Sequence, residues 1–247
     1  MNKVHVRIAE QPLRKLFLPA AIALSAALVV GVGAVNAQDD EMAADGIDGS
    51  WAVDTTIGEF DDFSSSWVGF RVAEVLSPGG DLEAVGRTPL VSGQLDVTGS
   101  VIENALIEAD LTGVVSDKTR RDDAIQRALG TGEFPTATFT SSEPVDLGAV
   151  PVDGEPFSAS VPGTVTIRDV SQDVTLELQG QRAGDVVVVV GTLPVDFTSY
   201  GVTMPSAPIV VSVEDSGDLE WQLFLTRGEE MADDELADDA EADDSEE

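Results

Sequence analysis

Short runs of alternating apolar and polar residues, separated by Gly and Pro, recur along most of this chain. Alternation with a period of two is typical of strands with one buried face. Many short strands joined by short turns predict an all-β fold, either a sandwich or a closed barrel, and closure is favoured because it removes exposed strand edges. The runs are residues 51–58, 66–76, 84–98, 101–111, 136–147, 161–168, 173–180, 185–197, 208–214 and 219–226.

Two of these runs depart from simple alternation. Residues 84–98 are predicted to form a strand that is interrupted near Pro89, because proline inside a strand implies an edge, a bulge or a turn. Five consecutive valines at 186–190 are suited to a strand that is buried on both faces.

One charged segment, at about 117–130, has helical spacing instead. Ser116 or Asp117 is suited to cap its start, and Gly130 is suited to end it. Its apolar stripe, centred on Ile125 and Leu129, is narrow. The segment is therefore predicted to be a helical insert that lies on a surface or covers an opening.

The chain divides into four parts by composition. Residues 1–37 are basic and then apolar, with an uncharged run at 16–35 and a Val-Asn-Ala sequence that suits signal peptidase, so they are predicted to be a signal peptide or a signal anchor. Either alternative predicts an exported protein, extracellular or in the cell envelope, and the anchor would tether it to a membrane. An acidic spacer follows at 38–49, then the domain at 50–227 and an acidic tail at 228–247 that is expected to be disordered.

The residue types that are scarce exclude several functions. The only histidine is His5, in the leader, and the chain has no cysteine. This excludes Ser-His-Asp and Cys-His catalysis, histidine zinc sites and haem ligation from the exported domain, so we expect no enzyme activity, no metal and no cofactor. The formal net charge of −33 makes nucleic acid an unsuitable partner. The oligomeric state is not predicted.

Four sequence blocks in one order resemble the YceI-like family, the polyisoprenoid-binding, lipocalin-like group. They include the helical insert followed by Glu-Phe-Pro and a strand. The resemblance implies an extended lipocalin-like antiparallel barrel with an apolar lumen that binds a long isoprenoid or other amphiphilic lipid. Within this family, the chain resembles an exported member of actinobacterial type. The four blocks are VGRTPLVSGQLDVTG (85–99), the segment from Arg121 to Phe139, VPGTVTIRDVSQDVTLEL (161–178) and PVDFTSYGVTMP (194–205).

The chain departs from the family pattern at two places. Glu74 stands where the family often has a histidine, and Arg168-Asp169 replaces the usual His-Gly or Arg-Gly turn. No role of those histidines can therefore be transferred. Glu74 is interpreted either as an outward or rim carboxylate or as a polar group that touches the head of a ligand.

The predicted ligand-binding residues are apolar, and each of them could equally be part of a packed core. Phe134 and Tyr200, with Met204, are expected to form the mouth of the lumen. The cluster Arg120-Arg121-Asp122 is either a structural ion-pair set or a clamp for a headgroup phosphate. The remaining predicted site residues, expected to line the lumen, are Trp67, Phe70, Val72, Phe139, Val165, Ile167, Leu176 and Trp221.

Three classes of function follow from these features. The leading hypothesis is an exported binding or carrier protein that holds a long apolar amphiphile, with the helical insert closing one end of the barrel. The alternative is a cell-envelope structural or stress-response protein whose barrel is filled and has no ligand. A carboxylate-based hydrolase is the third and least favoured hypothesis.

Overall fold

The computed structural model describes residues 46–205 and 209–228. This part of the chain is almost entirely β-structure, and its named strands pair antiparallel. It also contains the α-helix α1 (Thr119–Leu129) and two 3₁₀ helices, η1 (Leu111–Gly113) and η2 (Phe197–Tyr200). The strands are β1 (Gly49–Asp54), β2 (Trp67–Leu76), β3 (Gly80–Thr88), β4 (Val91–Thr98), β5 (Val101–Asp110), β6 (Thr136–Ser141), β7 (Val145–Asp146), β8 (Pro156–Ile167), β9 (Val170–Ala183), β10 (Val186–Asp196) and β11 (Val210–Arg227).

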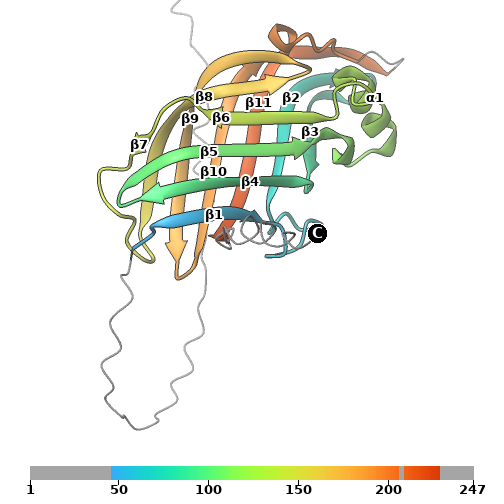
Figure 1. Cartoon of the computed structure of the whole chain (residues 1–247). Helices are drawn as coiled ribbons and strands as arrows, with labels where there is room; N and C mark the ends of the chain where they lie inside the picture. The colour runs from blue at the N-terminus through green and yellow to red at the C-terminus, as the bar shows by residue number, and fades with distance from the viewer. Residues whose placement is uncertain (1–45, 206–208, 229–247) are drawn as a thin grey trace, which may run out of the picture. The chain divides into compact units, whose positions relative to one another are not determined.

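Eight of the strands form a closed barrel. Their order is β1-β4-β5-β6-β8-β9-β10-β11, and β11 pairs back onto β1. The predicted choice of a closed barrel over a sandwich is therefore confirmed (Figure 1). Closure follows from the length of β11, whose last residues pair with β1 after its earlier residues have paired with β2.

The hairpin of β2 and β3 extends the sheet at one end of the barrel. β1 and β2 follow one another along the same edge of β11, with Phe224 opposite Asp54 and Gln222 opposite Trp67. Beyond the hairpin, only a single bridge between Arg87 and Val115 connects β3 to the segment that leads into α1. Figure 1 shows α1 at this same end, beside β2 and β3.

Four of the predicted strands differ from those in the structure. Residues 84–98 form two strands, β3 and β4, because the chain changes pairing partners at Pro89. Residues 136–147 also divide, into β6 and β7. In contrast, 208–214 and 219–226 belong to the single strand β11, which absorbs the intervening turn-like residues as an irregularity in register between Val213 and Gly217.

The valine run is not buried on both faces, so that prediction was wrong. Val187 and Val189 face the lumen, and only Val189 is fully buried. Val186, Val188 and Val190 alternate with them and are half-buried. A barrel wall is a single layer, so its outward positions lack the second layer of structure that would bury them.

The helix forms where predicted but begins two residues later. Lys118 occupies the N-cap position without a side-chain hydrogen bond, so the predicted caps Ser116 and Asp117 were wrong. Instead Asp122 Oδ1 accepts hydrogen bonds from the backbone N–H and the hydroxyl of Ser116, at 2.7 and 2.6 Å. Gly130 ends the helix as predicted, with a left-handed φ of 66°.

The predicted leader, most of the acidic spacer and almost all of the acidic tail lie outside the described residues. The last residues of the spacer belong to the fold, since Ile47 is buried and accepts a 2.8 Å hydrogen bond from Trp51 Nε1. Within the described ranges, no helix has the length and apolar character needed to cross a membrane.

Candidate functional site

The barrel contains an apolar cavity of about 220 Å³. A single buried water needs roughly 10–15 Å³, so this space is far larger than a packing defect. Among the described residues, no charged side chain lines it, and the hydroxyl-bearing residues of the lining are Thr88 and Thr138. The Thr88 hydroxyl is satisfied, because it donates to Asp110 O at 2.9 Å and accepts from Leu90 N at 3.1 Å. The cavity can therefore hold an apolar molecule but offers it almost no hydrogen bonds.

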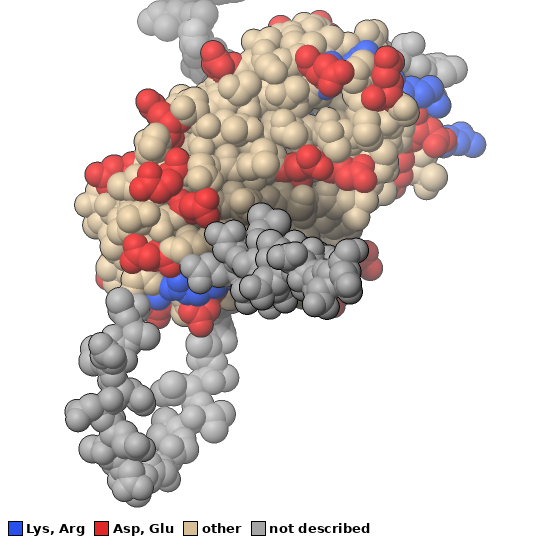
Figure 2. Space-filling view, in the orientation of Figure 1, with Lys and Arg blue, Asp and Glu red and all other residues tan. Residues whose placement is uncertain are grey.

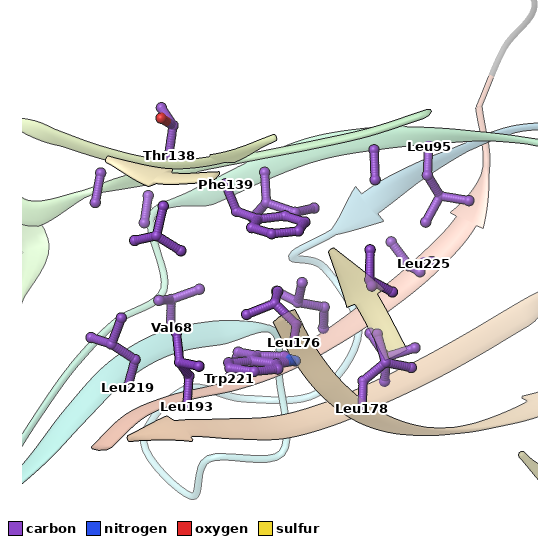
Figure 3. Close-up of a pocket in the computed structure, with 18 of the residues that line it drawn as sticks. Val68, Leu95, Thr138, Phe139, Leu176, Leu178, Leu193, Leu219, Trp221 and Leu225 are labelled. Carbon is purple, nitrogen blue, oxygen red and sulfur yellow. The ribbon is translucent and has the colours of Figure 1, made fainter. Parts of the chain in front are cut away.

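Opposite walls of the barrel contribute side chains that point toward one another. Phe139 from β6 faces Leu176 from β9 and Trp221 from β11, whereas Thr138 lies on the other side of its strand (Figure 3). This follows from strand geometry, since successive side chains point to opposite faces.

Aromatic rings in the wall lie over glycines of neighbouring strands. An added Cβ on these glycines would collide with the ring, so the absence of a side chain is what allows the ring to lie flat against the sheet. The pairs are Phe70 over Gly86, Phe139 over Gly163, Phe157 over Gly180 and Trp221 over Gly191.

Most of the predicted lumen residues lie in the cavity wall. Val72 and Met204 line a second, smaller pocket instead. Whether any of these side chains contacts a ligand stays a prediction. The predicted residues in the main wall are Phe70, Phe139, Val165, Ile167, Leu176 and Trp221.

Three predicted site residues lie outside both linings. The side chains of β2 that point into the barrel are at even-numbered positions, so Trp67 lies on the outer face of the strand. There the Arg87 guanidinium lies 4.3 Å from the centroid of the Trp67 ring. Phe134 lies in the turn after α1, with Arg168 over its ring at 5.5 Å. Tyr200 is a core residue of η2, only 2% exposed, and burial raises the pKa of its phenol.

The sequence argument missed several wall residues that the alternation could have identified. Leu219, Leu223 and Leu225 share a face of β11 with the predicted Trp221, and Leu178 follows Leu176 two residues later on β9. Trp51 carried no such signal, because its burial depends on β1 being paired on both edges, with β4 and β11.

The smaller pocket, of about 70 Å³, adjoins the cavity at the end that carries α1. Phe70, Leu129 and Phe197 line both spaces. Its lining includes one charged pair, in which Nη2 of Arg121 from α1 donates a hydrogen bond to Oε1 of Glu74 from β2. Glu74 is therefore not an outward carboxylate, since it is 6% exposed and faces the inside of the sheet.

Two members of the cluster at 120–122, Arg121 and Asp122, make contacts within the fold. Arg121 Nη1 donates to Asp117, and its Nη2 donates to Glu74. Asp122 holds the preceding loop through Ser116. With both terminal nitrogens of Arg121 engaged by carboxylates, the arrangement does not provide the phosphate clamp that was the alternative interpretation.

The outer surface contrasts with the cavity. Acidic side chains are scattered over the face shown in Figure 2, and basic ones are few. Among the described residues, no group of three or more His, Cys, Asp or Glu side chains is arranged to hold a metal ion.

Two solved structures are similar to this one. A polyisoprenoid binding domain from Saccharophagus degradans, implicated in plant cell wall breakdown, has 18% identity and a TM-score of 0.56, over 72% of this chain and 98% of that chain. BcnA of Burkholderia cenocepacia has 19% identity and a TM-score of 0.52, over 70% of this chain and 98% of that chain. At these identities the likeness establishes a shared fold. No curated protein sequence matches this chain significantly.

The sequence also matches the model of one protein family. The YceI-like domain model covers residues 52–225. This range contains the four sequence blocks that carry the resemblance and all the strands of the barrel except the first residues of β1 and the last residues of β11. The chain therefore belongs to the YceI-like family.

Proposed function

We propose that this protein binds a long apolar amphiphile, an isoprenoid or a comparable lipid, in the barrel cavity and carries it outside the cytoplasm. The observation that carries the proposal is an apolar cavity whose described lining residues carry no charge, inside a strongly acidic protein. The description of the Saccharophagus degradans neighbour as polyisoprenoid binding supports the same ligand class. We infer a binding function rather than a catalytic one, because the lining of the main cavity is apolar and the family is the one that contains a polyisoprenoid binding domain.

The energetics favour a long chain over a short one. Each methylene moved from water into the cavity contributes about 0.8 kcal/mol. Association costs an estimated 4–15 kcal/mol of translational and rotational freedom, so even at the lowest cost roughly fifteen buried methylenes are needed for micromolar affinity. Because no directional bond is required along the chain, the length and width of the tail decide the affinity.

One observation favours the alternative function. The cavity volume of about 220 Å³ lies below the roughly 300–1,000 Å³ of typical small-molecule sites. A cell-envelope structural or stress-response protein whose barrel is nearly filled by its own side chains would have such a volume. The carrier hypothesis requires the leucine-rich wall to move apart when the ligand enters.

Native mass spectrometry of protein purified from its own host distinguishes the two functions. The carrier hypothesis predicts an additional mass that corresponds to a long apolar molecule, which solvent extraction releases and identifies. Protein that is consistently free of any such molecule, and that takes up none when incubated with prenyl lipids, would support the structural alternative.

The proposed export depends on the leader alone. N-terminal sequencing of the protein from its host should find a mature chain that begins at Gln38, after the Val-Asn-Ala sequence. A chain that retains residues 16–35 and sediments with membranes would show that this segment is an anchor.

A further inference from the structure

Glu74 combines strong burial with an incomplete set of hydrogen bonds. Its side chain lies on β2, opposite Val213 of β11 and Leu82 of β3, and is 6% exposed. Oε1 accepts the hydrogen bond from Arg121, whereas Oε2 accepts none from the described residues. Oε2 is not one of the fully buried side-chain atoms that lack a partner, so it keeps some accessible surface. Since Glu74 lines the smaller pocket, this oxygen is available to whatever enters it.

Arg121 cannot readily be recruited by a negatively charged ligand. Its two terminal nitrogens are bonded to the carboxylates of Asp117 and Glu74, so one positive charge serves two negative ones. Lys118 lies 3.3 Å from Asp117 but is 68% exposed and is not part of the pocket lining. The pocket therefore presents a hydrogen-bond acceptor and no uncommitted cation.

The smaller pocket is placed to receive one end of a molecule that lies in the main cavity. Phe70, Leu129 and Phe197 line both spaces, so a chain that continues from one into the other passes between these side chains. Apart from Glu74 and Arg121, the residues that line the pocket are apolar. The polar end of an amphiphile would meet the Glu74 carboxylate there as its main hydrogen-bonding partner.

We propose that the smaller pocket binds the polar end of the cargo, and that this end is a hydrogen-bond donor, a hydroxyl or an amine, which Glu74 Oε2 accepts. The cargo then lies with its tail in the barrel and its head beneath α1. Long-chain alcohols and amines are accepted, whereas phosphates and carboxylates with the same tail are disfavoured, because the Glu74 carboxylate repels an anion and its partner Arg121 is already shared with Asp117. This inference depends on the proposed binding function and specifies the ligand class for that site.

Four isoprenoid probes test the inference. Geranylgeraniol, geranylgeranylamine and geranylgeranyl phosphate share one tail, and phytane is the saturated hydrocarbon with the same branching and no head group. Each is titrated into the full chain, and binding is followed by calorimetry and by tryptophan fluorescence, to which Trp51 and Trp221 in the cavity wall contribute. The affinity for the alcohol and the amine should be about tenfold or more above the affinity for the phosphate. A difference of this size is expected for one charge-assisted hydrogen bond.

Variants of the ion pair between Glu74 and Arg121 distinguish loss of the hydrogen-bond acceptor from loss of folding. Glu74→Gln should reduce the difference in affinity between the alcohol and the phosphate, because it removes the negative charge while keeping an oxygen acceptor. Glu74→Leu combined with Arg121→Leu removes both charges, so no unpaired buried charge is left to unfold the protein. In that double variant the alcohol should bind no more tightly than phytane. Glu83→Gln, on an exposed side chain of β3, is the matched control and should leave all four affinities unchanged.

The outcomes distinguish failure of the inference from failure of the proposed function. If none of the probes binds, the barrel is not a carrier of this ligand class. If all four bind equally, or if the phosphate binds most tightly and loses affinity in an Arg121→Leu variant, the tail is bound as proposed but the donor-selective head site is refuted.

Discussion

Small residues in the wall decide whether the barrel has room for a ligand. Ala105 and Ala109 on β5 and Ala137 on β6 line the cavity, and larger side chains at these positions would project into it. Glycines beside the aromatic rings act similarly, because they let the rings lie against the sheet. The cavity is thus maintained by specific small side chains, and replacing one of them should fill it.

Ala105→Phe should abolish cargo binding without unfolding the protein. The new ring enters existing space, so the overpacking cost of about 1–3 kcal/mol known for dense cores should be reduced or absent. Affinity for geranylgeraniol should fall about tenfold or more, since the ring occupies the volume of the tail. Ala73→Phe, on the exposed face of β2, is the control for added size. Undiminished binding by Ala105→Phe would show that the ligand lies elsewhere.

Tyr200 is the only tyrosine, so alkaline absorbance titration reports on this residue alone. Its ordinary pKa is 10.0, and burial raises the pKa in the folded protein. The neutral phenol is the favoured buried form, so its contribution to stability is complete below the unfolded pKa and is lost as pH rises through the folded value. The folded protein should titrate above pH 10.0 and the denatured protein near it. Identical titration curves would contradict this burial.

At the scale of elements, α1 lies at one end of the barrel and lines the smaller pocket. Its Ile125 packs on Leu111 and Val114, and Gln126 Nε2 donates to Leu111 O at 3.0 Å. Arg168 Nη1 donates to the carbonyl of Ala128 at 2.8 Å, which attaches the last turn to the β8–β9 turn. These contacts hold the helix over the smaller pocket without making it part of the sheet.

Replacing residues 118–130 by a Gly-Ser segment of equal length tests this role. The far-UV circular dichroism of the sheet should persist, because no strand pairing depends on the helix. The dissociation rate of bound geranylgeraniol should rise about tenfold or more in stopped-flow displacement, as most affinity changes are expressed in dissociation. Asp123→Ala, an exposed change on α1, should leave that rate unaltered. If point variants of α1 lowered the stability of the fold but left the dissociation rate of the ligand unchanged, the helix would be purely structural.

The whole molecule is a polyanion built around an uncharged main cavity. Because the formal net charge is −33, the acidic side chains repel one another in the compact state. The cavity lining contributes none of that charge. Surface repulsion and interior binding should therefore respond differently to salt.

Raising the salt concentration from roughly 0.01 to 0.5 M should raise the unfolding temperature, because the Debye length falls from about 30 Å to a few Å and screens the repulsion. Affinity for the neutral alcohol should change little over the same range, since no ion pair forms on binding. Calorimetric unfolding and binding titrations in matched buffers give both quantities. An unfolding temperature that falls with salt would show that ion pairs such as Arg71 with Glu220 outweigh the repulsion.

The sequence by itself determined the strand content, the helical insert ending at Gly130, the family and much of the cavity wall. These properties depend on local alternation, turn residues and motif order, which can be read without knowledge of distant contacts. Leu176 and Trp221 were identified for this reason, whereas Trp67 was misplaced by an error of one position in the alternation.

Only the tertiary structure decided which segments meet. The continuity of β11, the double pairing of β1 and the burial of Glu74 against Arg121 join residues that are far apart in the chain. Closure of the barrel is a property of strand register around the whole sheet, and no local pattern contains it. The donor-selective pocket could not be predicted for the same reason, because a carboxylate on a strand reveals its role only when the helix that partners it is in place.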